Sequence, residues 1–382
     1  DLRLGAMLSG GLDSSSIVGI VRERFRQELK EPLRTYSLVR MDRENCKEWP
    51  HVQAMLEGGW LTPTILTTDA PARGQPAFLM DAGCWDEPFP VTHGLTYGLV
   101  YDAAARDGCR AVLDGMAGDL LFLGLEGSLD WAVRKRSISS IQAARHAYAG
   151  HEVPGFWRDL AIRGAASVAP AVIRQGWRAM KGMARFRSPE ISLLRRDKSI
   201  PWLEARLGDL ETRGRRMGTE TELARHAGRY TSGLVSFAHE TYGQIAFAAG
   251  VEPRSPFSDR RVVEFALCLH PRQKLADTWY KGLLRAAMVG YLPDKVLWRQ
   301  DLGNHPGWQA YRAMFGVVLR PQMAPCALNA VMASVADWVD GEQLRKALSR
   351  APDGNDYYLR QRLFTIFSLA NWVEKSGSPN AA

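Results

Sequence analysis

The strongest constraint on the fold is a short loop near the start of the chain. Residues 9–15 read Ser-Gly-Gly-Leu-Asp-Ser-Ser, after an apolar run over residues 4–8 and before apolar positions at helical spacing as far as residue 25. This pattern predicts a strand, a tight loop and a helix. Small residues let consecutive backbone N–H groups face an anion, and the N-terminus of the following helix attracts negative charge. We therefore predict a phosphate-binding loop, with the nucleotide-binding residues Ser9, Gly10, Gly11, Asp13, Ser14 and Ser15.

Asp13 gives this loop a different chemistry from the Walker A loop, which ends in Gly-Lys followed by Ser or Thr. A carboxylate does not bind phosphate directly, but it holds Mg²⁺, a hard cation that bridges phosphate oxygens. We therefore predict that Asp13 is a magnesium ligand. The alternative is a structural role, in which Asp13 or Ser14 only caps the helix.

Strand and helix patterns alternate as far as residue 113. Apolar runs predict strands over residues 34–39, 64–66 and 110–113, and helical spacing predicts helices over 49–56 and 94–105. This alternation is typical of an α/β fold with a parallel sheet and flanking helices. Ligands bind such sheets beyond the carboxyl ends of the strands, so we expect the site at the loops after residues 8 and 113.

Helical periodicity replaces the strand pattern from about residue 129. We predict an α/β core over residues 1–128, a basic helical insert over 129–230 and a helical part over 231–382 that completes the active site. Much of the net charge of +8 lies in residues 174–216, where twelve Lys or Arg outnumber five Asp or Glu. Such a patch attracts nucleic acid, acidic lipid or an acidic peptide. The alternative is a solvated set of helix faces.

The composition favours a globular protein of the cytoplasm. Hydrophobic residues make up 46% of the chain, yet no run of 18 apolar residues and no signal-peptide layout occurs, which predicts neither membrane insertion nor secretion. The five cysteines form no Cys-x-x-Cys pair, as expected for reduced thiols. The first residue is Asp1, and the first strand begins almost at once, so we expect that a further segment precedes this one.

Taken together, five segments resemble the synthetase domain of the asparagine synthetases, which are N-type ATP pyrophosphatases. The loop over 9–15 resembles their pyrophosphate loop. The others are Asp86-Glu87-Pro88, LDGMAGDLLF over 113–122, EPRSPFSD over 252–259, and KGLLR over 281–285 followed by Leu292-Pro293 and Arg299. They resemble the family's Asp-Glu-Pro, Leu-Ser-Gly-x-Gly-x-Asp-Glu-Leu-Phe, Glu-x-Arg-x-Pro-Phe-Leu-Asp, and Lys-x-x-Leu-Arg with Leu-Pro and Arg. The resemblance implies an adenine nucleotide alpha hydrolase-like fold.

The resemblance also implies an AMP-forming ligase that uses ATP and Mg²⁺. A carboxylate attacks the α-phosphate, pyrophosphate leaves, and an amine then attacks the acyl-adenylate. Asp13 and Asp119 are the expected metal ligands, and Lys281 is the cation expected at the α-phosphate. Gly115 and Arg254 are further candidates for nucleotide binding.

Each of these roles has a structural alternative. Asp119 fits a cap or salt bridge in a glycine-rich turn, and Lys281 fits a solvated helix lysine. Arg254 and Arg285 fit either bidentate binding of a carboxylate or phosphate, or internal ion pairs with Asp259 or Glu264.

The acceptor side departs from the family pattern. Met116 stands where asparagine synthetases have a glutamate near the substrate amine, and Leu120 replaces the second acid of the Asp-Glu pair. Gln300-Asp301 also stands where a basic residue is expected. Methionine cannot accept a proton, so these changes favour a bulkier or less polar substrate than aspartate. Relatives of this kind include β-lactam synthetases and the macrolactam cyclases of lasso peptides.

In the macrolactam interpretation the substrate is a carboxylate-bearing precursor peptide, and a biosynthetic protease is an expected partner. Glu240 or Glu252 is then the candidate base for the amine. The alternative for each is a structural acid beside a helix. The basic insert also suits a peptide, which needs a larger surface than aspartate does.

Other functions stay open at this point. An upstream glutaminase-like domain that opens with a catalytic cysteine would favour asparagine synthesis from aspartate, whereas a domain without that cysteine would favour an amine within the substrate. A tRNA-modifying or thiolating enzyme shares the Ser-Gly-Gly-x-Asp-Ser loop, but the chain has neither a reactive cysteine pair nor aromatics interleaved with basic residues. We therefore expect no nucleic-acid partner. A non-catalytic binding module would have no use for the two acids and the lysine, so we expect an active enzyme.

Overall fold

The computed structural model describes residues 3–39, 42–67, 87–89, 93–122, 155–168, 233–274, 279–299, 325–350 and 357–376, with isolated residues within 133–145, 193–197 and 226–231. The chain divides into two compact units. The first comprises residues 1–67, 100–170 and 217–308, and the second comprises 68–99, 171–216 and 309–382. Each unit encloses its own buried apolar side chains.

A five-stranded parallel sheet with the order β3-β2-β1-β4-β5 forms the centre of the first unit. The strands are β1 Leu4–Met7, β2 Leu33–Val39, β3 Leu61–Thr67, β4 Ala111–Leu113 and β5 Glu252–Arg254. Gly5 on β1 pairs with Arg34 on one side and with Val112 on the other. The chain thus builds the sheet outward from β1 in both directions, and the edge beyond β1 and β4 is a topological switch point.

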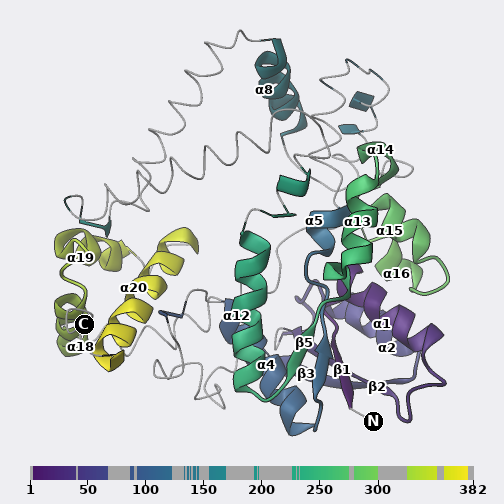
Figure 1. Cartoon of the computed structure of the whole chain (residues 1–382), viewed down its shortest axis with the longest axis horizontal. Helices are drawn as coiled ribbons and strands as arrows, with labels where there is room; N and C mark the ends of the chain where they lie inside the picture. Colours follow the sequence, from purple (N-terminus) through teal and green to yellow (C-terminus); the bar gives the residue numbers. More distant parts are fainter. Residues whose placement is uncertain are drawn as a thin grey trace. The chain divides into compact units, whose positions relative to one another are not determined.

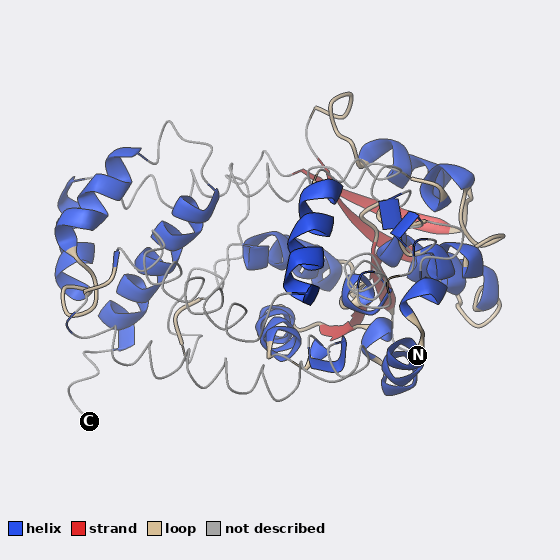
Figure 2. Cartoon of the chain, turned by 90° about the horizontal axis from the view of Figure 1, so that it is seen from above, coloured by secondary structure: helices blue, strands red, loops and turns tan. Residues whose placement is uncertain are grey.

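Helices cover both faces of this sheet, as predicted. Figure 1 shows α1 (Leu12–Arg24) and α2 (Trp49–Glu57) on one face and α4 (His93–Arg106) and α12 (Leu234–Ala248) on the other, and Figure 2 shows the sheet between helices from above. The α/β class is therefore confirmed. The strand at residues 252–254 was not predicted, because a three-residue strand containing proline has no alternation to detect.

Short helices follow β5 and bring the later motifs back to the sheet. They are the 3₁₀ helix η4 (Pro256–Ser258), α13 (Arg260–Cys268), α14 (Pro271–Lys274), α15 (Gly282–Ala287) and α16 (Asp294–Leu297). Asp259 caps α13 by accepting the N–H of Arg261 at 2.9 Å. Two further helices of this unit are α5 (Gly118–Phe122) and α8 (Phe156–Val168).

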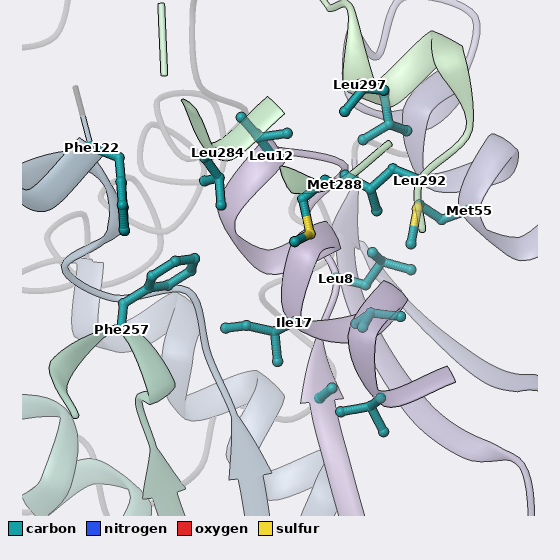
Figure 3. Close-up of a cluster of buried hydrophobic side chains, with 14 of the residues drawn as sticks. Leu8, Leu12, Ile17, Met55, Phe122, Phe257, Leu284, Met288, Leu292 and Leu297 are labelled. Carbon is teal, nitrogen blue, oxygen red and sulfur yellow. The ribbon is translucent and has the colours of Figure 1, made fainter. Parts of the chain in front are cut away.

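The main hydrophobic core lies between the sheet, α1 and the short helices. Its buried side chains include Leu8, Leu12, Ile17, Met55, Phe122, Phe257, Leu284, Met288, Leu292 and Leu297 (Figure 3). The rings of Phe122 and Phe257 meet edge to face with centroids 5.9 Å apart. Because α15 and α16 contribute to the same core as β1 and α1, burial of apolar surface holds the segment after residue 280 against the phosphate-binding loop.

A buried arginine strengthens this junction. Arg22 on α1 donates to the carbonyls of Met55 on α2 and Tyr291, each at 3.1 Å. Gly19 on α1 allows the close approach, since a Cβ there would lie 2.8 Å from the Tyr291 carbonyl oxygen. The α1 helix is therefore fixed on its side facing α2 and the chain before α16.

The described part of the second unit is largely helical. It contains α18 (Pro325–Ser334), α19 (Gly341–Arg350) and α20 (Tyr357–Ser376), and α18 and α20 pack together. Asp340 caps α19 by accepting the N–H groups of Glu342 and Gln343, both at 3.0 Å. No helix in the described ranges has the length and apolarity that a membrane span needs.

Several sequence predictions fall outside the described residues. They concern Asp86, Gln300-Asp301 and most of the basic stretch 174–216, of which only 193–195 and 197 are described. The predicted insert over 129–230 is likewise described only in part.

Candidate active site

The loop between β1 and α1 is shaped by its own serines. The Ser14 hydroxyl lies 2.9 Å from Ser9 Oγ and accepts the backbone N–H of Ser9 at 3.1 Å. The N–H of Gly11 donates to Ser9 Oγ at 3.3 Å. Gly10 has a φ of +72°, and a Cβ there would lie 2.9 Å from the Cβ of His51 on α2. Only glycine fits at this position, so the predicted tight loop is confirmed.

The predicted nucleotide-binding residues of this loop differ in accessibility. Ser9 is exposed and Gly11 is half-buried, whereas Ser14 and Ser15 are buried. Gly11 is the N-cap of α1, so the open side of the loop coincides with the N-terminus of a 13-residue helix. An anion approaching there meets backbone N–H groups and the positive end of the helix dipole. The Ser14 hydroxyl shapes the loop through its hydrogen bonds with Ser9.

The loop after β4 lies directly against the phosphate-binding loop. A Cβ on Gly115 would lie 2.8 Å from the backbone N of Ser14, and a Cβ on Gly118 would lie 2.5 Å from Cγ of Asp13. Both positions therefore require glycine for the two loops to touch. Gly115 acts here by permitting this contact, and the predicted meeting of the two loops at the carboxyl edge of the sheet is confirmed.

Three neighbouring residues fix the shape of the second loop. The N–H of Asp114 donates to the carbonyl of Arg254 on β5 at 2.9 Å, and the buried Asp114 carboxylate accepts the N–H of Met116 at 3.0 Å. Ala117 has a φ of +69°, in the left-handed region that favours glycine. The family pattern has glycine at this position, so the loop keeps the backbone shape of the pattern at a cost in strain.

Lys281 binds the two loops through their acids. Its Nζ lies 2.5 Å from both carboxylate oxygens of Asp13 and 2.7 Å from Oδ1 of Asp119. The lysine side chain is only 4% exposed, that of Asp13 is 14% exposed, and that of Asp119 is 65% exposed. We call these three residues the Asp13–Lys281–Asp119 cluster. The alternative of a solvated lysine is wrong, because the ammonium is buried between two carboxylates.

Tyr280 and Arg285 hold this cluster in position. The Tyr280 hydroxyl donates to Oδ1 of Asp119 at 2.7 Å, and the Tyr280 ring lies 5.3 Å from the Lys281 ammonium. Arg285 donates to the carbonyls of Tyr280 at 2.7 Å, Arg299 at 2.9 Å and Leu297. The guanidinium is buried and its donors reach backbone carbonyls, so Arg285 supports the backbone around Lys281.

Burial and charge act in opposite directions on the ionisable groups of the cluster. Burial raises the pKa of Asp13 above its usual value, while Lys281 lowers it and Asp119 raises it further. Burial would lower the pKa of Lys281, but the charges of Asp13 and Asp119 outweigh that effect and raise it. Burial also lowers the pKa of Arg285 to about 10. Lys281 is therefore a firmly charged cation between two acids.

The cluster has donors that suit Mg²⁺. Magnesium prefers oxygen ligands and is commonly held by one or two carboxylates together with substrate phosphates. Asp13 and Asp119 supply two carboxylates that already converge on one cation, the Lys281 ammonium. No group of three or more His, Cys, Asp or Glu side chains gathers in the described ranges, so substrate phosphate oxygens and water would complete the coordination. The residues present fit a magnesium ion bound together with a polyphosphate.

The two candidate bases lie apart from the cluster contacts. Glu240 is exposed on α12, and Glu252 at the start of β5 pairs with Arg254 at 2.9 Å. In the described structure neither glutamate makes a hydrogen bond or ion pair with the cluster. The alternative in which Arg254 or Arg285 pairs with Asp259 or Glu264 is wrong, since Asp259 pairs with Arg261 at 2.9 Å and Glu264 with Arg260 at 2.7 Å.

Sequence reasoning missed three contributors to the site. Tyr280 touches Asp119, Asp114 shapes the second loop, and Glu48 lies 3.5 Å from Nη2 of Arg299, whose Nη1 is 3.4 Å from the Gly10 carbonyl. Tyr280 directly precedes Lys281 in the sequence, and this adjacency is the one sequence feature that could have pointed to Tyr280. The roles of Asp114 and Glu48 depend on contacts between distant segments.

Comparison with known proteins is consistent with this geometry. A family described as asparagine synthase matches residues 1–374 of the chain. The chain is also similar to asparagine synthetase (glutamine-hydrolyzing) 3 of Bacillus subtilis (strain 168), with 25% identity over 308 residues. The match covers 78% of this chain and 44% of the relative, so the chain spans less than half the length of that relative.

Proposed function

The chain belongs to the asparagine synthase family, and from that premise we propose that it is an ATP-dependent ligase that joins a carboxylate to an amine. A carboxylate oxygen of the substrate attacks the α-phosphorus of ATP, and the bond to pyrophosphate breaks. The amine then attacks the acyl-adenylate, loses a proton, and expels AMP. Negative charge develops on phosphate oxygens in the first step, so preorganised cations have the largest effect on its rate.

One observation carries this proposal: the Lys281 ammonium lies between Asp13 and Asp119 at the N-terminus of α1. The open side of the first loop receives the pyrophosphate end of ATP, and Lys281 stabilises the charge that develops at the α-phosphate. Magnesium, when bound, neutralises charge on the departing pyrophosphate. Asp13 and Asp119 would hold that ion.

Exchange of labelled pyrophosphate into ATP tests the proposed activation step. We expect Asp13→Asn, Asp119→Asn and Lys281→Ala each to lower exchange by at least about 100-fold, the usual scale for loss of a charged group at a transition state. Lys295→Ala is the control, because Lys295 is exposed on α16. Normal exchange in any of the three variants would remove that residue from the mechanism.

For the acceptor, we propose macrolactam formation in a lasso-type peptide, in which the peptide's own N-terminal amine attacks its activated side-chain carboxylate. Met116 and Leu120 support this, because the second loop carries no acid at the positions where asparagine synthetases bind a small charged substrate. Both side chains are half-buried in and directly after the second loop, where they add apolar surface. Such a surface favours a peptide over free aspartate.

The base that receives the amine proton is proposed to be Glu240 or Glu252. Both carboxylates are exposed and so are available to a substrate. We expect Glu240→Gln or Glu252→Gln to slow amide formation while pyrophosphate exchange continues, since exchange does not need the amine. Loss of exchange in either variant would place that glutamate in ATP binding instead.

Product analysis separates the two acceptors. With MgATP and a precursor peptide, the proposal predicts a peptide product that is lighter by one water, with one AMP and one pyrophosphate released from ATP per amide bond. With aspartate and ammonia or glutamine, asparagine would instead indicate the alternative, asparagine synthesis. Met116→Glu should not create asparagine synthesis by itself, because other positions on the acceptor side also differ from the asparagine synthetases. Asparagine formation by that variant would argue against a peptide substrate.

A further inference from the structure

The Lys281 ammonium occupies the position at which Asp13 and Asp119 would hold a divalent ion. It lies within 2.5 to 2.7 Å of three carboxylate oxygens from two different loops. A magnesium ion lies about 2.1 Å from its ligands. An ion bound to the same oxygens would therefore come close to the ammonium, where repulsion between the two cations is strong.

The fold holds the lysine in this position by several means. Lys281 has a φ of +52°, a left-handed conformation that is costly for a residue with a side chain. The Tyr280 hydroxyl fixes Asp119, and Arg285 fixes the Tyr280 carbonyl. Lys281 approaches from the protein interior, whereas Asp119 is 65% exposed and marks the open side of the cluster. The backbone conformation and these hydrogen bonds therefore place the lysine side chain beside the two acids when no nucleotide is bound.

We propose that Lys281 is an internal counter-ion that excludes free divalent cations from Asp13 and Asp119, so that the metal enters only together with a polyphosphate. The phosphates take over the ammonium, and the two carboxylates become free for the ion. The identity of the polyphosphate as ATP rests on the proposed function. The exclusion of free metal does not, because it depends only on the geometry of the three side chains.

Metal binding without catalysis tests this inference. Mn²⁺, whose free concentration is measured by electron paramagnetic resonance, is added to the full chain without nucleotide. We expect weak binding to the wild type and binding at least about tenfold tighter to Lys281→Met, in which the chain length is kept and the charge removed. Lys295→Met is the matched control, and we expect it to bind Mn²⁺ as weakly as the wild type.

A double variant locates the gained site. Asp13→Asn combined with Lys281→Met should lose the tight Mn²⁺ binding, since one of the two carboxylates is gone. Adding ATP to the wild type should produce tight Mn²⁺ binding. Equal affinity of the wild type and Lys281→Met for free Mn²⁺, or tight binding by the double variant, would overturn the inference.

Two further measurements keep the test decisive. Mg²⁺ should raise the unfolding temperature of Lys281→Met but not that of the wild type in the absence of nucleotide. If Lys281→Met does not fold, the wild type decides alone: tight binding of free Mn²⁺ contradicts the proposal, and binding that requires ATP supports it. Pyrophosphate exchange tests the proposed ligase activity separately, so either idea can fail without the other.

Discussion

Lys281 Nζ contacts both carboxylate oxygens of Asp13 at 2.5 Å, although 268 positions separate the two residues in the chain. The contact joins the first turn of α1 to the residue preceding α15. Both helices contribute to one hydrophobic core, through Leu12 and Ile17 on one side and Leu284 on the other. Packing at a distance from this contact therefore sets the separation between the Lys281 ammonium and the Asp13 carboxylate.

Close contact between the two loops predicts a severe effect of Gly118→Ala. The added Cβ would lie 2.5 Å from Cγ of Asp13, so the Asp13 carboxylate or the second loop must shift, and we expect the contact with Lys281 to be disturbed. We expect pyrophosphate exchange to fall by about 100-fold, the typical result of a displacement of about 1 Å at a catalytic group. Gly243→Ala on α12 is the control, because a Cβ at residue 243 would have no neighbouring atom within 4 Å. It should leave exchange unchanged and stabilise the fold by about 0.5 to 1 kcal/mol.

The left-handed backbone of Ala117 predicts that Ala117→Gly stabilises the protein. Its φ of +69° costs an alanine more than a glycine. We expect a gain of up to about 1 kcal/mol in the free energy of unfolding, measured by urea titration. Ala286→Gly, at an exposed position within α15, should instead lose about 1 kcal/mol. A loss of similar size in both variants would mean that Ala117 is not strained.

The hydrogen bond from Tyr280 to Asp119 predicts a specific loss in Tyr280→Phe. The ring that packs beside Lys281 remains, but the 2.7 Å contact with the carboxylate disappears. A hydrogen bond to a charged group contributes about 1.5 to 3 kcal/mol, so we expect MgATP to bind about 10 to 100 times more weakly in calorimetry.

Tyr36→Phe serves as its matched control. The Tyr36 hydroxyl donates to Asp107 at 2.9 Å and lies 3.3 Å from the Cys109 sulfur, so its hydrogen bonds involve none of the three cluster residues. We expect this variant to lose about 1 kcal/mol of stability and to bind MgATP normally. Equal effects of both variants on nucleotide affinity would show that Tyr280 acts only through general stability.

Burial of Asp114 predicts a pH-dependent gain in Asp114→Asn. Burial raises the pKa of Asp114, although the N–H of Met116 and the side chain of Ser255 lower it in part. A carboxyl whose pKa is raised by folding contributes stability below its unfolded pKa of 3.8 and loses it as pH rises through the folded value. Asparagine still accepts the Met116 N–H but does not ionise.

We therefore expect Asp114→Asn to unfold at a higher temperature than the wild type at pH 7, with the difference shrinking toward pH 4. Thermal unfolding followed by circular dichroism at several pH values measures this. A difference that stays constant from pH 4 to pH 7 would contradict the raised pKa.

The local sequence determined the parts of the site that depend on short-range rules. The loop over residues 9–15 and the apolar residues on either side of it predicted a strand, a glycine turn and a helix. Apolar periodicity and the left-handed turn at Gly10 depend on neighbouring residues only. The motif resemblance pointed to Asp13, Asp119 and Lys281 before any geometry was known. These three side chains do lie together.

Only the tertiary structure decided how these residues are used. It placed the Lys281 ammonium between Asp13 and Asp119, directed Arg285 to backbone carbonyls, and paired Arg254 with Glu252. It also formed β5, whose three residues pair with β4 only because the sheet offers an open edge. The physical reason is that ionic contacts and strand pairing between distant segments depend on burial and distance, which the packed core sets and no local pattern encodes.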